Sequence, residues 1–219
     1  MSFVKTVLVI SHLPILAAVA SALFLYPTLG KALRAFSWFL FLSGAVQFAS
    51  LWLFLAGKNN MPLLHFYVAA GLPMLLWFYK RVLGNFISSV VIWGIAACFV
   101  IFTIINSLFL QDIYRFNSHA LTVESVIIII LSLFTFIFFL NTTMKATGIE
   151  DRKSLNWINS GLFIYYLSCL LIFYFGDIIL FRFSRDTSGI TWLFHSFFSI
   201  VMYSFFIIGL WKRSKTQHL

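Results

Sequence analysis

Residues 122–141 read TVESVIIIILSLFTFIFFLN, and Glu124 is the one charged residue among them. About 20 predominantly apolar residues are enough to cross the hydrocarbon core of a bilayer as an α-helix. A water-soluble domain cannot hide many segments of this kind, whereas a chain in lipid has no need to hide them. We therefore expect this segment to be a transmembrane helix.

Further stretches of the same kind occupy most of the remaining chain. The composition agrees, because 62% of the residues are hydrophobic, only 10% are charged, and the mean hydropathy is +0.99. The sequence predicts an all-α membrane protein, a single transmembrane domain over residues 1–219 built as a seven-transmembrane helix bundle. The expected spans lie near residues 6–26, 35–57, 62–80, 87–110, 122–141, 155–177 and 190–211.

The charged residues define how this bundle is oriented. The net charge of +9 comes from basic residues at the ends of the spans, where they anchor helices in lipid, so we expect membrane lipids and no nucleic acid as partners. Cytoplasmic loops carry an excess of Lys and Arg. Ten basic residues on one face against five on the other predict an N-terminus outside and a C-terminus in the cytoplasm. The ten are Lys31, Arg34, Lys80, Arg81, Lys145, Arg152, Lys153, Lys212, Arg213 and Lys215; the five are Lys5, Lys58, Arg115, Arg182 and Arg185.

Two parts of the chain look alike. Ser43-Gly44 precedes a helix that ends in Trp77-Phe78-Tyr79-Lys80-Arg81, and Ser160-Gly161 precedes one that ends in Trp211-Lys212-Arg213. Such a likeness indicates a 3+1+3 parallel repeat, with spans one to three and five to seven as equivalent units, as in some transporters. The alternative is that apolar helices resemble one another by composition alone.

Polar residues inside spans point to function, because they are costly in lipid. Several share one depth, near the outer ends of different spans, with Glu124 at the start of the fifth. We expect them to line a ligand pocket that opens outward. The candidates are His12, Gln47, His65, Asp177, His195 and Ser199.

Two other interpretations of these histidines remain open. They could cap helix ends and face headgroup water. Alternatively, His12, His65 and His195 with a carboxylate could hold zinc, whose open position would activate water for hydrolysis. None of the three has the HExxH or HxxxH spacing that places two ligands on one helix face.

Two smaller sets of residues near the inner ends of spans have simpler expected roles. Tyr79 is expected in the aromatic belt at the membrane surface. The polar residues that end span five and begin span six are expected mainly to cap helices, namely Asn141, Thr142, Thr143, Asn156, Asn159 and Ser160.

Three known seven-helix types lack their key residues here. Covalent retinal binding requires a lysine within the last span, and residues 190–211 contain none. The Pro-Gln pair of 3+1+3 sugar transporters is absent. The HxxxH of ceramidase-type hydrolases is incomplete, because the residue four after His195 is Ser199.

Two runs of sequence nevertheless resemble a group of uncharacterised bacterial seven-helix membrane proteins. They are KNNMPLLHFY at residues 58–67 and WINSGLFIY at residues 157–165. The group often carries an acidic residue six positions after the histidine, where this chain has Gly71. The resemblance implies a bacterial inner-membrane protein of sensory type.

We expect a receptor-like or sensory module, and not an enzyme. It would bind a small or lipidic ligand and signal to a separate cytoplasmic or membrane partner. The alternatives are a small-molecule transporter of 3+1+3 type, an intramembrane metal-dependent hydrolase, and a scaffold subunit of a membrane complex.

Overall fold

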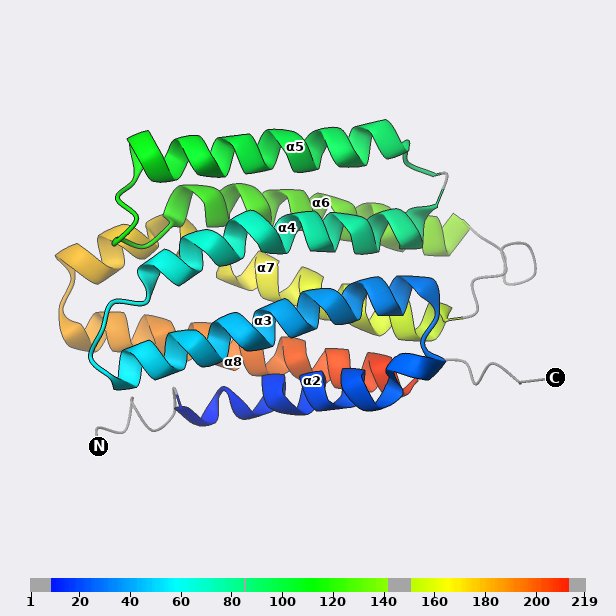
Figure 1. Cartoon of the computed structure of the whole chain (residues 1–219), viewed down its shortest axis with the longest axis horizontal. Helices are drawn as coiled ribbons and strands as arrows, with labels where there is room; N and C mark the ends of the chain where they lie inside the picture. The colour runs from blue at the N-terminus through cyan, green and yellow to red at the C-terminus, as the bar shows by residue number, and fades with distance from the viewer. Residues whose placement is uncertain (1–8, 85, 142–150, 213–219) are drawn as a thin grey trace.

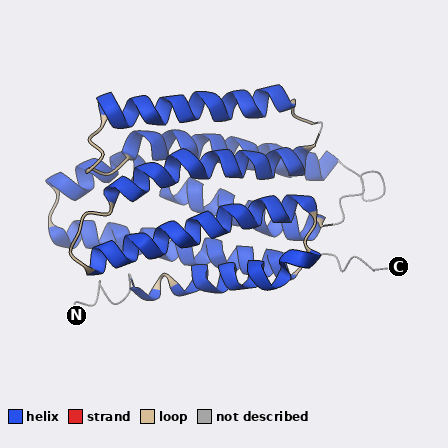
Figure 2. Cartoon of the chain, in the orientation of Figure 1, coloured by secondary structure: helices blue, strands red, loops and turns tan. Residues whose placement is uncertain are grey.

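The computed structural model describes residues 9–84, 86–141 and 151–212, and in this part of the chain the regular elements are all helices, joined by short loops and without a strand (Figure 2). A short 3-10 turn, η1 (Tyr26–Thr28), follows the first helix, and a π-helical turn, η2 (Asn106–Leu110), extends the fourth. The seven α-helices of the described residues are α2 (Leu13–Leu25), α3 (Lys31–Leu55), α4 (Met61–Leu83), α5 (Ser89–Ile105), α6 (Ser118–Asn141), α7 (Arg152–Arg182) and α8 (Arg185–Trp211).

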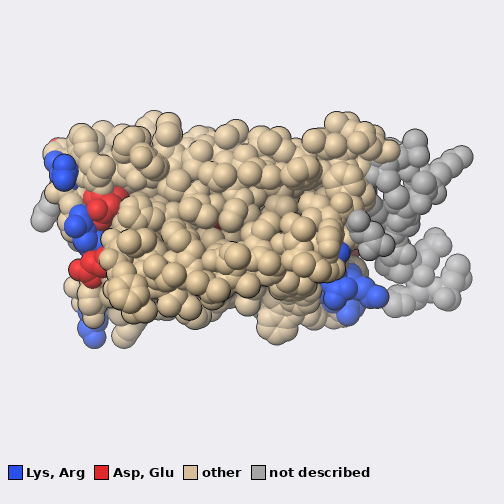
Figure 3. Space-filling view, turned by 90° about the horizontal axis from the view of Figure 1, so that it is seen from above, with Lys and Arg blue, Asp and Glu red and all other residues tan. Residues whose placement is uncertain are grey.

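Six of these helices are long and apolar enough to cross a membrane, and α2 with η1 forms a shorter apolar segment, Leu13–Thr28. Charged residues gather at the two ends of the molecule, with a broad uncharged band between them (Figure 3). A band of this kind matches a hydrocarbon core flanked by two aqueous surfaces. The described helices thus indicate a multi-pass membrane protein.

The helices lie side by side along the long axis of the bundle (Figure 1). Six of them close into a ring, because α2 packs on α3 and α8, α3 on α4, α4 on α6, α6 on α7, and α7 on α8. The remaining helix, α5, has its main contacts with α4 and lies outside this ring. The interior of the fold is therefore that of a six-helix ring.

Three helix boundaries near the candidate site differ from the expected spans. Helix α6 begins at Ser118, four residues before the expected 122, so Glu124 lies within the helix and not at its start. Helices α7 and α8 extend toward each other to Arg182 and Arg185, where a longer loop was expected. The side chain of Ser184 accepts a hydrogen bond from the Thr187 amide and so allows α8 to begin early.

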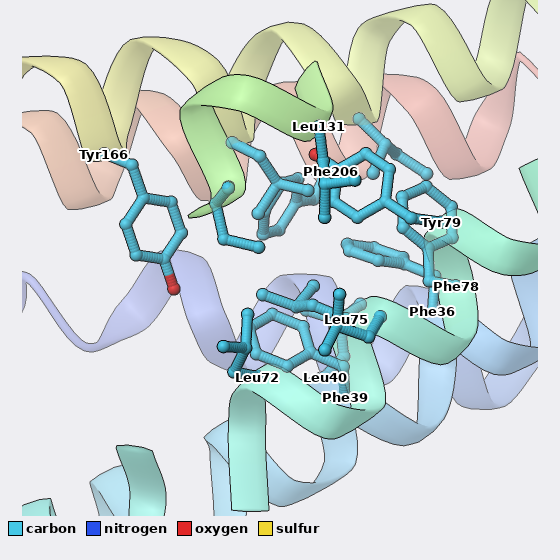
Figure 4. Packing of buried hydrophobic residues seen from close by; sticks show 14 of the residues in the cluster. Phe36, Phe39, Leu40, Leu72, Leu75, Phe78, Tyr79, Leu131, Tyr166 and Phe206 are labelled. Carbon is cyan, nitrogen blue, oxygen red and sulfur yellow. The ribbon is translucent and has the colours of Figure 1, made fainter. Parts of the chain in front are cut away.

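An aromatic cluster holds the middle of the bundle together. Phe36 of α3 packs edge-on against Phe206 of α8, with ring centroids 4.8 Å apart, and lies 5.3 Å from Phe78 of α4. All three side chains are buried, and Leu40 and Leu75 lie beside them, while Tyr166 stands apart from the group (Figure 4). This contact brings α3, α4 and α8 together.

A polar network lies deeper than the sequence predicted. Tyr79 is fully buried, and its hydroxyl donates to Asn159 Oδ1 at 3.1 Å and lies 2.8 Å from Ser132 Oγ. The Asn159 amide donates in turn to the Ser132 carbonyl at 3.1 Å. The expectations of a belt position for Tyr79 and a capping role for Asn159 were wrong, because both residues pair across α4, α6 and α7. Thr142 and Thr143 lie outside the described residues.

Replacing Tyr79 by Phe is expected to destabilise the bundle by about 0.6–1.7 kcal/mol, the range measured for hydrogen bonds between transmembrane helices. The variant keeps the ring but leaves Asn159 Oδ1 without its donor. Reversible unfolding in mixed micelles measures the change, and Tyr174→Phe, at an exposed tyrosine of α7, is the matched control. Equal stabilities of the two variants would contradict the proposed importance of this network.

Candidate functional site

The ring encloses a cavity of about 40 Å³. A buried water molecule needs roughly 10–15 Å³ on this measure, so the space holds a few waters or one small ligand. Side chains from five of the six ring helices line it, namely Phe39 and Gln47 of α3, Tyr67 of α4, Leu121 and Glu124 of α6, Tyr165, Tyr166 and Phe173 of α7, and Met202 and Tyr203 of α8.

Glu124 is the most unusual residue of this cavity. Its side chain is only 1% exposed, and its Oε1 accepts a hydrogen bond from the Tyr166 hydroxyl at 3.2 Å. Within the described residues, its Oε2 has no hydrogen-bond partner. Buried polar atoms are nearly always satisfied, so an unsatisfied carboxyl oxygen beside a cavity indicates a missing partner.

The space beside Glu124 depends on a small residue of the neighbouring helix. A Cβ atom placed on Gly71 of α4 would lie 3.8 Å from Glu124 Oε1, and Pro73 follows two residues later inside the same helix. The carboxyl that faces Gly71 comes from α6.

The tyrosine hydroxyls around the cavity are held in fixed positions. Gln47 Nε2 donates to the Tyr203 hydroxyl at 2.7 Å, and the Tyr67 hydroxyl lies 3.0 Å from Ser43 Oγ. Because the Tyr203 oxygen accepts from Gln47, its own hydrogen remains free to point toward a ligand. The cavity thus offers a strong acceptor, Glu124 Oε2, together with hydroxyl donors.

Two of the residues predicted for the pocket reach this cavity. Gln47 lines it directly, and His195 Nε2 lies 2.9 Å from the hydroxyl of Tyr165, which also lines it. The His195 ring packs edge-on against Tyr165, Phe173 and Trp192. Gln47 of α3 and His195 of α8 therefore come to the same site, as expected from the sequence. That they bind a ligand stays a prediction.

The other predicted residues lie away from the cavity. His65 Nδ1 lies 2.7 Å from Ser107 Oγ, and its Nε2 lies 3.2 Å from the Arg115 carbonyl, so it joins α4 to the segment between α5 and α6. Arg115 donates a bidentate pair of hydrogen bonds to Asp177, from Nε to Oδ1 at 3.0 Å and from Nη2 to Oδ2 at 2.7 Å. His12, directly before α2, and Ser199, on α8, are half-buried and are not among the residues that line the cavity.

A metal site has no support in the geometry. In the ranges that the structure describes, no three His, Cys, Asp or Glu side chains come close enough together to hold a metal ion. His65 and His195 each bond to different partners, on different helices.

Sequence reasoning missed the four tyrosines that dominate the site, Tyr67, Tyr165, Tyr166 and Tyr203. The sequence did contain one pointer to this site, although not to the tyrosines: Glu124 is the single charged residue in an otherwise uncharged segment. Chemically, the arrangement can hold a small ligand that donates hydrogen bonds to a carboxyl group and presents its apolar surface to aromatic rings.

No family model, curated protein or solved structure matches this chain.

Proposed function

We propose that this chain is a receptor-like membrane protein that binds a small cationic ligand beside Glu124 and passes the resulting change to a separate partner. The observation that carries the proposal is the buried Glu124 carboxyl, which within the described residues has one unsatisfied oxygen, beside a cavity inside the ring. Ionisable residues within transmembrane helices are expensive and, as a rule, functional. Because the cavity contacts five helices of the ring, its occupation is expected to affect how they pack.

The chemistry of the walls favours a small cation. A carboxyl oxygen without a partner needs a hydrogen-bond donor, and tyrosine rings attract cations at their faces. The volume of about 40 Å³ limits the ligand to the size of ammonium or a short primary amine. A lipidic ligand, which the sequence also allowed, would require the ring to open.

The full chain reconstituted in lipid nanodiscs is expected to bind ammonium and methylammonium in calorimetric titrations. Tetraethylammonium, which is too large for the cavity, and acetate, which carries the wrong charge, are expected to show no binding. Equal binding of tetraethylammonium would place the site outside the cavity, and the absence of binding by both small cations would refute the proposal.

The proposed orientation has seven spans, the N-terminus outside and the C-terminus in the cytoplasm of a bacterial cell. It is supported by the ten-to-five asymmetry of basic residues. A reporter enzyme that is active only in the cytoplasm is expected to be active when fused after Leu219, and a periplasmic reporter at the same position is expected to be inactive. The opposite pattern would contradict this topology. The basic cytoplasmic face is then the surface available to a signalling partner.

A transporter is the second candidate, and helix α4 is the observation that favours it. Gly71, next to Glu124, and Pro73 both lie inside this continuous helix, at a place where a hinge could alternately expose the cavity to either side. The ring with α5 outside is compatible with a 3+1+3 repeat, which stays a proposal. Uptake of methylammonium into proteoliposomes would favour transport, whereas binding without uptake would favour the receptor.

A further inference from the structure

A second hollow lies at the end of the bundle where α4 ends and α5 begins. It measures about 380 Å³, within the approximate range of 300–1,000 Å³ typical of ligand clefts. The residues that line it are Trp77, Lys80 and Arg81 of α4, Gly84 after its end, and Trp93 of α5. None of them takes part in the cavity around Glu124.

Every polar side chain in this cleft is a hydrogen-bond donor. Lys80 Nζ donates to the carbonyls of Gly84 at 2.6 Å and Ile87 at 3.1 Å, which leaves one of its three hydrogens free. Within the described residues, the Arg81 guanidinium and the indole N–H groups of Trp77 and Trp93 have no hydrogen-bond partner. Two cations and two indoles without a carboxylate among them are suited to an anion with several oxygens.

We propose that this cleft binds the phosphate group of an anionic phospholipid. Basic pockets between transmembrane helices are suited to such headgroups, and a planar guanidinium pairs with phosphate through two parallel hydrogen bonds. The position of Lys80 and Arg81 on the more basic face of the bundle agrees with the negative charge of cytoplasmic leaflets.

The surroundings of the cleft favour a lipid over a soluble phosphate. Helix α5 lies outside the ring, and its first turns expose Val90 to 81% and Trp93 to 48%. In a membrane, this exposed apolar surface lies against acyl chains. A headgroup in the cleft would therefore have its own chains on the adjoining surface of α5, whereas a soluble anion would gain nothing there.

Native mass spectrometry of the full chain, released from detergent with defined lipids, tests the proposal. The wild type is expected to retain phosphatidylglycerol in preference to phosphatidylcholine. Arg81→Gln is expected to lower the affinity for phosphatidylglycerol by about tenfold or more, the loss expected for a charge-assisted hydrogen bond. Lys31→Gln removes an exposed cation from the same end of the bundle but outside the cleft, and is expected to leave the affinity unchanged.

Equal retention of the two lipids would overturn the proposal. An equal loss of affinity in Lys31→Gln and Arg81→Gln would also overturn it, because only the overall charge of this face would then matter. Competition with soluble sn-glycerol 3-phosphate distinguishes the two sources of phosphate. Weak competition supports a lipid, whereas full displacement at low concentration would assign the cleft to a soluble phosphate ester. Because Arg81 is exposed, its substitution is not expected to affect folding, and the melting temperature checks this.

Discussion

Glu124→Gln is expected to weaken the binding of ammonium and methylammonium by about 10- to 100-fold. A hydrogen bond to a charged group contributes about 1.5–3 kcal/mol, and each 1.4 kcal/mol is about a factor of ten in affinity. Glutamine has nearly the same shape as glutamate, so the cavity keeps its size while the carboxyl group that would pair with the cation is lost. Titration calorimetry of the variant in nanodiscs measures the effect.

Two further variants make this result specific to the cavity. Tyr166→Phe removes the donor to Glu124 Oε1 but keeps the carboxyl, so a smaller loss is expected. Asp177→Asn removes a carboxylate that is already paired with Arg115, and binding should be unchanged. If Asp177→Asn weakened binding as much as Glu124→Gln, the cation would bind at the end of the bundle where Asp177 pairs with Arg115. Wild-type affinity in Glu124→Gln would exclude Glu124 from the site.

The same carboxyl should affect stability in the opposite direction. Burying a carboxyl group with one oxygen unsatisfied costs free energy, because that oxygen has lost its water without gaining a partner. Glutamine also leaves a polar group unpaired at this position, but a neutral amide costs less free energy to bury than a carboxylate, so the ligand-free Glu124→Gln protein is expected to be at least as stable as the wild type. The proposed ligand binding and the stability of the bundle would then oppose each other at this residue, and polar residues inside membranes are costly to bury.

The helical membrane bundle could be predicted from the sequence because it follows from length and polarity alone. A segment such as 122–141 can satisfy its backbone in lipid only as a helix, whatever its neighbours are. The exact ends of the helices depend on local contacts that polarity does not encode. Glu124 was placed at a helix end because α6 was expected to begin four residues later than it does.

The candidate site was harder to predict because it depends on which way each helix faces. Depth in the membrane grouped Gln47, His65 and His195, but it does not say which of them face the interior of the ring. Rotation of α4 then directs His65 toward Ser107 and Arg115, and Tyr67, two residues later, toward the cavity. In spans as uniformly apolar as these, no polar stripe reveals the inward face, so the tyrosines gave no signal.

The contact between α7 and α8 is where a substitution should destabilise the fold most. A Cβ atom on Gly209 would lie 2.7 Å from Ile158 Cγ1 and 3.0 Å from the Ser154 carbonyl oxygen, while Ser154 Oγ donates to the Gly209 carbonyl at 2.6 Å. A Cβ atom on Gly161 would lie 2.9 Å from Phe205 Cβ and 3.2 Å from the Met202 carbonyl oxygen. Small residues allow transmembrane helices to approach closely, and here backbone atoms block any larger side chain.

Gly161→Val and Gly209→Val are each expected to destabilise the protein by about 1–3 kcal/mol, the usual cost of overpacking, and by more if α7 and α8 separate. Gly94→Val is the matched control, because a Cβ atom there meets nothing within 4 Å on the peripheral helix α5. Since all three substitutions exchange glycine for valine within a helix, differences in backbone propensity cancel in the comparison. Unfolding in mixed micelles measures the three variants. An equal loss at Gly94 would show that helix propensity, and not close packing of α7 against α8, explains the effect.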